Sequence, residues 1–511
     1  MRAFLMYRDR DVDPDAALPW NADALIQDLE LDTLFDAMAG GDAFVRAVVV
    51  RSVLDSLDDL DDIAYRQAIV ADCIGQPDVI REVHAIAVEA IEREKRVYGG
   101  ILGRQPERLL SRSLDVLQIF LELLKRLRRL ADEHASSFRS EGLGRFFRMI
   151  ATELDDAYLA SIEDHLRRLR FDRGMLISAG LGEGTKGADY VLRVPPAGQR
   201  RLVDRVLGDR SGLVYTIADR DVAGFEALAE LRNRGLSVVA RALAQSADHI
   251  LGFFAMLRVE TAFYVGCLGL RDRLAGNGEP TCMPQALPAR DPHLTAHGLY
   301  DACLSLRVDG RVIGNDVAGT GKTLIVVTGA NRGGKSTFLR SVGLAQLMMQ
   351  AGMFVPAESF AADVASGIYT HYRREEDATM TRGKFDEELA RMSAIIERIR
   401  PGGVVLLNES FASTNELEGS EIARHVIEAL LDARIKVVCV THLFELADGF
   451  HRDASPAVLF LRAERRADGQ RTFRVVEGEP LPTSHGADLY RQIFGTTPGS
   501  RQATKVGGPA A

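Results

Sequence analysis

The chain has 511 residues, of which 46% are hydrophobic and 26% are charged, and its formal net charge is −9. This length is typical of about three or four domains, and this composition is typical of a globular protein with buried cores. The acidic balance argues against a broad, non-specific grip on nucleic acid, although it is compatible with a local basic surface.

Residues 1–40 form an N-terminal segment of mixed composition that contains the only tryptophan, Trp20. The segment becomes acidic too soon for a secretory signal peptide, and no apolar run along the chain approaches the ~18 residues that span a membrane. The five cysteines are scattered without a C-x-x-C pair, which argues against disulfides and a zinc site. We therefore expect a cytoplasmic protein with reduced thiols and no membrane partner.

Residues 41–299 are predicted to be mainly helical. A long helix is indicated by leucines that recur at alternating steps of four and three, a spacing that makes a narrow apolar face. These residues are Leu110, Leu114, Leu117, Leu121 and Leu124. A basic run follows at residues 125–129, and we favour a solvated helix face over a DNA contact for it.

A small β-rich insertion is predicted at residues 172–222, with strand-like runs at 175–178, 190–194 and 213–218. It contains a G-x-G-x-x-G match that begins at Gly182. A strand, and not a helix, is predicted after this match, so we do not expect a dinucleotide-binding fold.

A stretch rich in glycine and proline at residues 275–293 indicates a domain boundary. Strands then alternate with helices over residues 300–490, as in a parallel sheet that is covered by helices on both faces. The tail, residues 491–511, is predicted to be disordered.

The most informative motif is TGANRGGKST, which begins at Thr328 and fits the pattern G-x-x-x-x-G-K-[ST]. A strand-like segment precedes it and a helix-like segment follows, so its backbone N–H groups can close around phosphate oxygens. Lys335 is suited to the β- and γ-phosphates and Ser336 to Mg²⁺, so we predict ATP and Mg²⁺ as ligands. The residues assigned to nucleotide binding here are Gly329, Ala330, Asn331, Arg332, Gly333, Gly334, Lys335, Ser336 and Thr337.

Two further strands end in polar residues that suit phosphoryl transfer. The strand at 404–407 ends in Asn408 and Glu409, and we assign Glu409 as the general base that orients the attacking water. Asn408 is assigned to the Mg²⁺ shell, where an amide supplies no charge, so we expect weaker Mg²⁺ binding. The next strand ends in His442, which can sense the γ-phosphate.

Two polar segments flank amphipathic helices. Residues 373–385 precede a helix for which we predict one apolar face, and residues 412–419 form a loop before another helix. The predicted apolar face consists of Leu389, Met392, Ile395, Ile396 and Ile399.

Together these motifs resemble the MutS family of DNA mismatch-repair ATPases. The phosphate loop resembles that family's GPNMGGKST, THLFELA (which contains His442) resembles THYFEL, and TSHG at residues 483–486 resembles the SYG segment. The resemblance is strong over residues 312–490 and only architectural over 41–300. It implies a helical lever, a clamp that closes over DNA at 172–222, and a homodimer whose two ATP sites are each completed by the partner subunit.

The resemblance also implies residue roles. It places Asn315 near the adenine, and it places Thr414 and Asn415 at the dimer interface. It brings Arg382, Gly383 and Lys384 near the partner's γ-phosphate, where Gly383 stands in place of the family's serine. Asn408 stands in place of the family's aspartate, and no Phe-x-Glu wedge lies near the start of the chain, so we expect no mismatch reading.

The sequence therefore predicts a multidomain protein: a helical lever and core with a β-rich clamp, followed by a P-loop NTPase domain of the ABC type. The leading hypothesis is an ATPase that gates a dimeric clamp on DNA by recognising shape or backbone. A second hypothesis is a nucleotide-gated regulatory protein that hydrolyses ATP feebly and does not bind DNA. An ABC transporter subunit is ranked behind both, because no LSGGQ-like segment is present.

Overall fold

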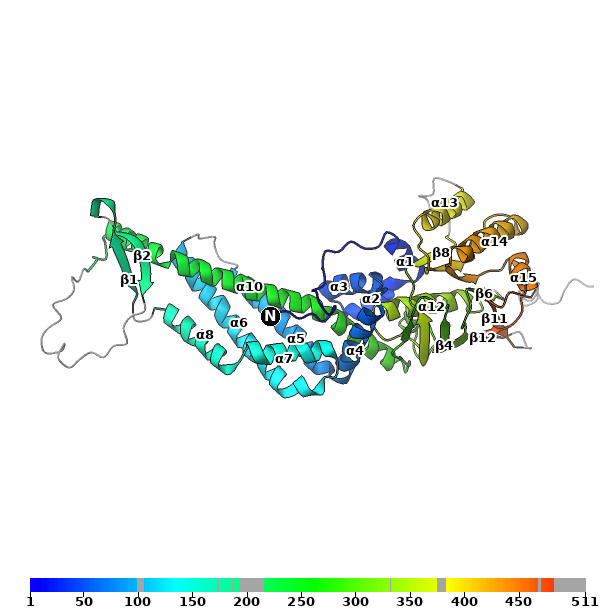
Figure 1. The fold of residues 1–511 in the computed structure, drawn as a ribbon, viewed down its shortest axis with the longest axis horizontal. Coiled ribbons are helices and arrows are strands. Elements are labelled where there is room, and N and C mark those ends of the chain that lie inside the picture. The colour runs from blue at the N-terminus through cyan, green and yellow to red at the C-terminus, as the bar shows by residue number, and fades with distance from the viewer. Residues whose placement is uncertain are drawn as a thin grey trace, which may run out of the picture. The chain divides into compact units, whose positions relative to one another are not determined.

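The computed structural model describes residues 1–98, 105–171, 174–185, 187–193, 216–330, 332–374, 383–466 and 470–481. Contacts divide the chain into two compact units, whose elements are drawn in Figure 1. The first unit comprises Met1–Val12 and Gly75–Ala262, and the second comprises Asp13–Ile74 and the chain from Phe263 onward. These bounds differ from the predicted breaks after residues 40 and 299, because residues 13–74 fold with the C-terminal part.

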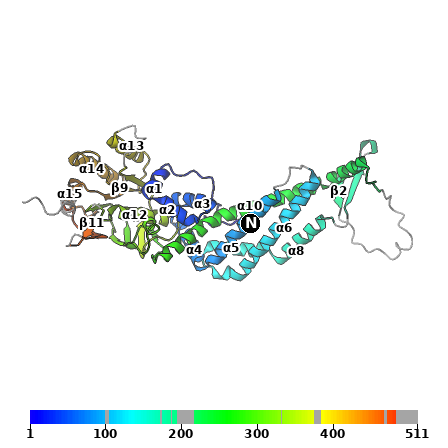
Figure 2. The ribbon, with the colours of Figure 1, turned by 180° about the vertical axis from the view of Figure 1, so that it is seen from behind.

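The first unit is mainly a helical bundle, seen from the front in Figure 1 and from behind in Figure 2. Its helix α6 contacts α5, α7 and α8. The five leucines predicted to form one apolar face lie on α6 and are all buried, which confirms that prediction. The helices are α5 (Pro77–Tyr98), α6 (Pro106–His134), α7 (Glu141–Glu153), α8 (Asp156–Leu169) and the first part of α10 (Val222–Gly276).

Basic residues of the run near the end of α6 form ion pairs within the first unit. Lys125 Nζ lies 2.7 Å from the Glu163 carboxylate, and Arg126 contacts both Glu82 and Glu89 at 2.6 and 2.5 Å. These pairings support the interpretation of the run as a solvated helix face.

Among its described residues, the predicted β-rich insertion contains one antiparallel hairpin, made of β1 (Leu176–Leu181) and β2 (Gly187–Arg193). Because β2 begins at the last glycine of the G-x-G-x-x-G match, a strand follows that match, as predicted. The third predicted run is not a strand at residues 216–218, and its residues 213–215 lie outside the described part of the chain.

Glu260 of α10 anchors the N-terminal segment of the first unit. Its carboxylate accepts hydrogen bonds from the backbone N–H groups of Leu5, Met6 and Val12 at 2.6, 2.7 and 2.9 Å. Burial, reinforced by the negative charge of Asp11, raises the pKa of the Glu260 carboxyl, although the three N–H donors act against that rise.

Helix α10 is long and apolar enough, by length and composition, to cross a membrane, which the sequence analysis did not anticipate. In the structure 61% of its most apolar window is buried within the protein. A core helix accounts for this composition, because burial among neighbouring elements also selects apolar residues.

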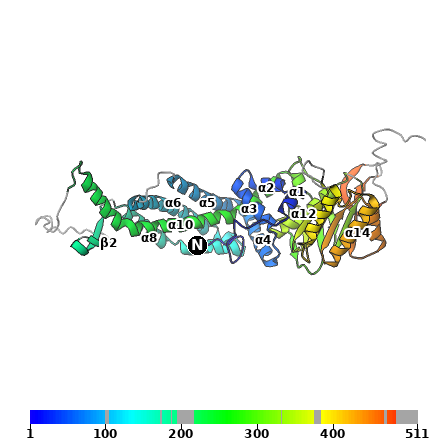
Figure 3. The same cartoon turned by 90° about the horizontal axis from the view of Figure 1, so that it is seen from above.

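The second unit begins with four helices and contains two sheets. Three of the helices, α1, α2 and α3, lie beside one another (Figure 3). The larger sheet has the strand order β12-β11-β6-β10-β9-β8, and the smaller has the order β3-β7-β4-β5. The first four helices are α1 (Ala22–Asp28), α2 (Leu31–Ala39), α3 (Ala43–Leu54) and α4 (Leu60–Gly75).

In the larger sheet β11, β6, β10, β9 and β8 are parallel, and β12 pairs antiparallel with β11. The smaller sheet consists of β3 (Gln285–Leu287), β4 (Leu294–Leu299), β5 (Asn315–Ala318) and β7 (Ser359–Asp363). The larger consists of β6 (Leu324–Thr328), β8 (Ile368–Tyr372), β9 (Val404–Asn408), β10 (Lys436–Val440), β11 (Val458–Arg465) and β12 (Arg471–Glu477).

Helices cover both faces of the larger sheet, as predicted. Helix α12 (Lys335–Gln350) packs against β9 and β10 on one face. Alternate strand residues such as Val326 and Leu407 point to the other face, where they form a core with α13 (Lys384–Ile396), α14 (Glu416–Asp432) and α15 (Phe444–Arg452). A short helix, α11 (Ala302–Ser305), follows the smaller sheet's β4.

The predicted apolar face of α13 is partly wrong. Met392 and Ile395 are buried, but Leu389 and Ile396 are exposed. Glu388 takes a buried place on this helix instead, because its carboxylate accepts a hydrogen bond from the Ser413 hydroxyl at 2.8 Å.

A buried ion pair joins the two sheets of the second unit. Lys436, at the start of β10, contacts the Asp363 carboxylate at the end of β7, and both side chains are less than a tenth exposed. Asp363 also accepts the backbone N–H of His293 at 2.9 Å. Burial lowers the pKa of Lys436, and the charge of Asp363 partly offsets that effect.

Candidate functional site

The phosphate loop joins β6 to α12, as the sequence predicts. Gly329 and Gly334 have φ angles of 112° and 94°, a conformation that favours glycine. A Cβ atom on either residue would also lie 3.0 Å from a backbone atom, of Ala463 in one case and Phe473 in the other. The positive φ angles and the close approach to the β11–β12 hairpin both favour glycine at these two positions.

Lys335 begins α12 directly after the loop and is buried. Its Nζ atom donates hydrogen bonds to the carbonyl oxygens of Gly329 and Ala330, at 2.8 and 3.2 Å. Burial lowers the pKa of the Lys335 ammonium group, and the negative charge of Glu409 acts in the opposite direction. The ammonium group thus lies over the loop that would hold phosphates.

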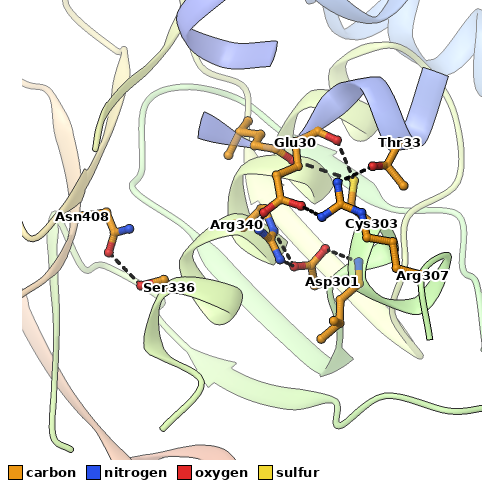
Figure 4. A network of polar contacts seen from close by, with 10 residues as sticks. Glu30, Thr33, Asp301, Cys303, Arg307, Ser336, Arg340 and Asn408 are labelled. Carbon is orange, nitrogen blue, oxygen red and sulfur yellow. Dashed lines mark hydrogen bonds and ion pairs between the residues drawn. The ribbon is translucent and has the colours of Figure 1, made fainter. Parts of the chain in front are cut away.

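Ser336 and Asn408 are brought together from α12 and β9. The Ser336 hydroxyl donates a hydrogen bond to Asn408 Oδ1 at 3.0 Å (Figure 4). Oxygen atoms of this kind suit Mg²⁺, which usually takes only one or two protein ligands and completes its shell with water and phosphate oxygens. Within the described residues no cluster of three or more His, Cys, Asp or Glu residues could hold a metal alone. The pair therefore fits a Mg²⁺ ion that arrives with a nucleotide.

Glu409 and His442 follow neighbouring parallel strands, so they meet at the same edge of the sheet. Asn408 pairs in register with Val440, and the Glu409 N–H donates to Val440 O at 2.8 Å. His442 Nδ1 lies 3.9 Å from Glu409 Oε1, and both side chains are about one third exposed. A partly open carboxylate beside the phosphate loop can accept a proton from a water molecule.

The predicted adenine-side residue, Asn315, begins β5 and is buried. Its Oδ1 atom accepts the backbone N–H of Val475 in β12 at 2.7 Å, so it also joins the two sheets. A cavity of about 700 Å³ opens beside it, lined by residues that include Tyr300, Ile313 and Leu459. The cavity therefore adjoins the residue predicted for the adenine side and has both apolar and charged lining residues.

The residues predicted to act at a dimer interface have local roles in the single chain. Asn415 caps α14 by accepting the N–H of Glu418, and the Thr414 hydroxyl bonds to the Glu418 carboxylate at 2.5 Å. Gly383 is the N-cap position of α13 and Lys384 is the first residue of that helix. The predicted site residues Asn331 and Arg382, and the segment at 483–486, lie outside the described residues.

A polar network that the sequence analysis missed anchors α12 (Figure 4). Arg340, one turn after Ser336, donates to the buried Asp301 carboxylate at 2.5 Å and also contacts Glu30. Glu30 in turn contacts Arg307. Burial raises the pKa of the Asp301 carboxyl, although the charge of Arg340 opposes that rise. The network fixes the helix that presents Lys335 and Ser336.

His371 was also missed. It lies on β8 with no exposed surface, and its ring contacts Ser410, the residue after Glu409, at 2.8 Å. The signal that could have identified His371 is its place near the end of a short buried strand, beside the strand at 404–407.

Comparison with known proteins assigns this architecture to one family. A model of the MutS2 N-terminal domain matches residues 58–277, and a model of MutS domain V matches residues 325–494. The chain is 26% identical over 373 residues to the DNA mismatch repair protein MutS of Parasynechococcus marenigrum, a match that covers 70% of this chain and 40% of that protein.

Two further relatives match shorter stretches. The DNA mismatch repair protein MutS of Thermus aquaticus is 35% identical over 167 residues, covering 32% of this chain and 20% of that protein. That of Petrotoga mobilis is 30% identical over 171 residues, covering 33% and 21%. The chain thus spans two fifths or less of the length of these relatives. With both family models matched, the chain belongs to the MutS family.

Proposed function

We propose that this chain binds ATP with Mg²⁺ and hydrolyses it at the edge of the larger sheet. The observation that carries the proposal is the convergence of Lys335, the Ser336–Asn408 pair and Glu409 at the ends of β6 and β9. These positions supply a cation for phosphates, oxygens for a metal and a base for water.

Each of these residues has its own role in the proposed hydrolysis of ATP. Loop N–H groups and the N-terminus of α12 hold phosphate oxygens, and Lys335 exchanges its carbonyl partners for the β- and γ-phosphates. Ser336 and Asn408 hold Mg²⁺, which when bound neutralises charge on the phosphates. Glu409 orients the attacking water and takes its proton, and His442 lies close enough to influence that carboxylate.

The test compares the wild type with Glu409→Gln, which keeps the side chain's size and removes its charge. We expect the hydrolysis rate to fall by about 10²–10⁴-fold, the usual contribution of a general base, while ATP affinity stays within about threefold. A variant that hydrolyses ATP at the wild-type rate would refute the role of Glu409.

We further propose that the active form is a homodimer that uses ATP to control a clamp on DNA, with the region 172–222 as the clamp. Family membership and the β1–β2 hairpin support this proposal. Glu409→Gln should then accumulate as an ATP-bound dimer with a doubled mass in solution. Replacing 172–222 by a short Gly-Ser linker should abolish salt-sensitive binding to duplex, branched or looped DNA.

A second function is favoured by the charge distribution. The net charge is −9, and the basic residues Lys125 and Arg126 of α6 are already ion-paired. The alternative is a nucleotide-gated regulatory protein that binds ATP and a protein partner but no DNA. If the intact protein binds none of the three DNA forms at low salt while still binding ATP, this alternative replaces the DNA clamp.

A further inference from the structure

The backbone of His371 is held in the larger sheet, and three contacts hold its buried ring. It pairs in register with Leu407 of β9, directly beside the strand that ends in Glu409. Its Nε2 lies 2.9 Å from the Glu388 carbonyl oxygen of α13, and its Nδ1 lies 2.8 Å from the Ser410 hydroxyl. The Phe411 ring stacks on it at 5.5 Å. The ring therefore connects β8, α13 and the turn after β9.

The partners of the ring fix its tautomer. The Glu388 carbonyl can only accept, so Nε2 must carry a proton. Burial, together with the charges of Arg391 and Arg374, lowers the pKa of His371 to about 4, so the ring is neutral near pH 7. Nδ1 then carries no proton. The Ser410 hydroxyl donates to the His371 carbonyl oxygen at 2.7 Å and lies 2.8 Å from Nδ1, so its single proton is shared between these two acceptors of His371.

The turn that Ser410 occupies is strained. Glu409 and Phe411 have φ angles of 53° and 61°, in the left-handed region that residues with a Cβ rarely adopt. Such a conformation persists only when the surrounding structure holds it. Ser410 lies between the two strained residues, and Phe411 has no exposed surface.

A second contact ties the same turn to α13. The Ser413 hydroxyl donates to the buried Glu388 carboxylate at 2.8 Å, so Glu388 holds the turn through its side chain and, by way of His371, through its carbonyl group. The direction of the Glu409 carboxylate depends on the backbone of this turn.

We propose that His371 is a positioning residue for Glu409: through the hydroxyl of Ser410, it holds the strained turn that aims the Glu409 carboxylate at the attacking water. This inference rests on the proposed ATP hydrolysis. Because His371 has no exposed surface, its effect on the reaction would pass through the turn and not through contact with the nucleotide or the water.

The first test removes the hydroxyl with Ser410→Ala. A misplacement of about 1 Å can lower a rate by about 10²-fold, so we expect the single-turnover hydrolysis rate to fall about 10- to 100-fold. ATP affinity in the presence of Mg²⁺ should stay within about threefold, because the phosphate loop is untouched. The matched control is Ser420→Ala, since Ser420 is equally buried and its hydroxyl has no hydrogen-bond partner among the described residues. Equal rates for the two variants would overturn the proposal.

A second pair of variants tests the ring itself. His371→Asn places an amide oxygen near the position of Nδ1 and can still accept from Ser410, whereas His371→Gln places its amide near Nε2. We expect His371→Asn to keep a rate within about fivefold of the wild type and His371→Gln to fall with Ser410→Ala. The opposite order would overturn the proposal, and circular dichroism confirms that each variant is folded.

A double variant shows whether the effect passes through Glu409. In the Glu409→Gln background, Ser410→Ala should cause no further loss of rate, because the carboxylate that it positions is gone. A further tenfold loss would overturn the proposal and leave the proposed function intact. A wild-type protein that binds ATP without hydrolysing it would instead overturn the proposed function, and the inference with it.

Discussion

Ser336 Oγ donates a 3.0 Å hydrogen bond to Asn408 Oδ1, so the hydroxyl best placed for Mg²⁺ is held by a neutral amide. A carboxylate at this position would add a full negative charge to the ligand shell. The proposed metal site therefore has two oxygen atoms in place but a weaker electrostatic attraction for Mg²⁺ than a carboxylate would give.

Asn408→Asp should restore that attraction. Hydrogen bonds to a charged group exceed those to a neutral one by about 1 kcal/mol, which corresponds to about a fivefold change in affinity, and we take this value as a minimum for the metal-bound water that residue 408 would accept from. We expect the Mg²⁺ concentration that gives half-maximal ATP hydrolysis to fall about fivefold. An unchanged Mg²⁺ dependence would show that Asn408 does not limit metal binding.

Lys335→Met should raise the stability of the fold while abolishing ATP binding. Burial lowers the pKa of Lys335, so its ammonium form destabilises the nucleotide-free fold, and this cost fades as the pH rises toward the ordinary value of 10.5. We expect the variant to gain about 1 kcal/mol in the free energy of unfolding at pH 7 and to lose measurable ATP binding. Urea titration of Trp20 fluorescence and nucleotide titration provide the two measurements. A less stable variant would mean that the bonds of Lys335 to the loop outweigh its burial.

The Lys436–Asp363 pair should behave as a buried ion pair. Lys436→Met leaves an unpaired buried carboxylate and should lower the free energy of unfolding by about 3–5 kcal/mol. Adding Asp363→Asn should recover most of that loss, because the amide oxygen still accepts the N–H of His293 and no charge remains buried. The same urea titration measures both variants, and a double variant as unstable as the single one would contradict the prediction.

Glu260 should make the first unit sensitive to pH. Its pKa is raised above the ordinary 4.5, so the folded state binds a proton more readily than the unfolded chain does. The contribution to stability is complete below pH 4.5 and is lost as the pH rises through the folded-state pKa. The free energy of unfolding of the wild type relative to Glu260→Gln should therefore decline from about pH 4.5 upward, as measured by circular dichroism in urea. A constant difference would show that Glu260 titrates normally.

Local patterns were sufficient to predict the phosphate loop and the positions of Glu409 and His442. Each depends on a short buried strand followed by polar residues, and parallel strands bring such ends together. The apolar face formed by the five leucines of α6 was also predictable, because their spacing alone defines one face of a helix.

Contacts between segments distant in the sequence could not be predicted from the sequence. Arg340 contacts Glu30, which lies 310 positions away in the sequence, and His371 contacts Ser410, which lies 39 positions away. Local residue spacing therefore cannot predict either pair. The apolar face of α13 was partly mispredicted because Glu388 became buried through a tertiary hydrogen bond with Ser413. Hydrophobic periodicity treats every carboxylate as exposed and cannot anticipate such a partner.

The hydrogen bonds of Lys335 to the carbonyl groups of Gly329 and Ala330 would make the proposed nucleotide binding an exchange of partners. Each new contact between the ammonium group and a phosphate is formed as a contact within the loop is given up. The heat released on binding should accordingly be smaller than a count of phosphate contacts suggests, because the bonds of Lys335 to its two carbonyl partners are lost.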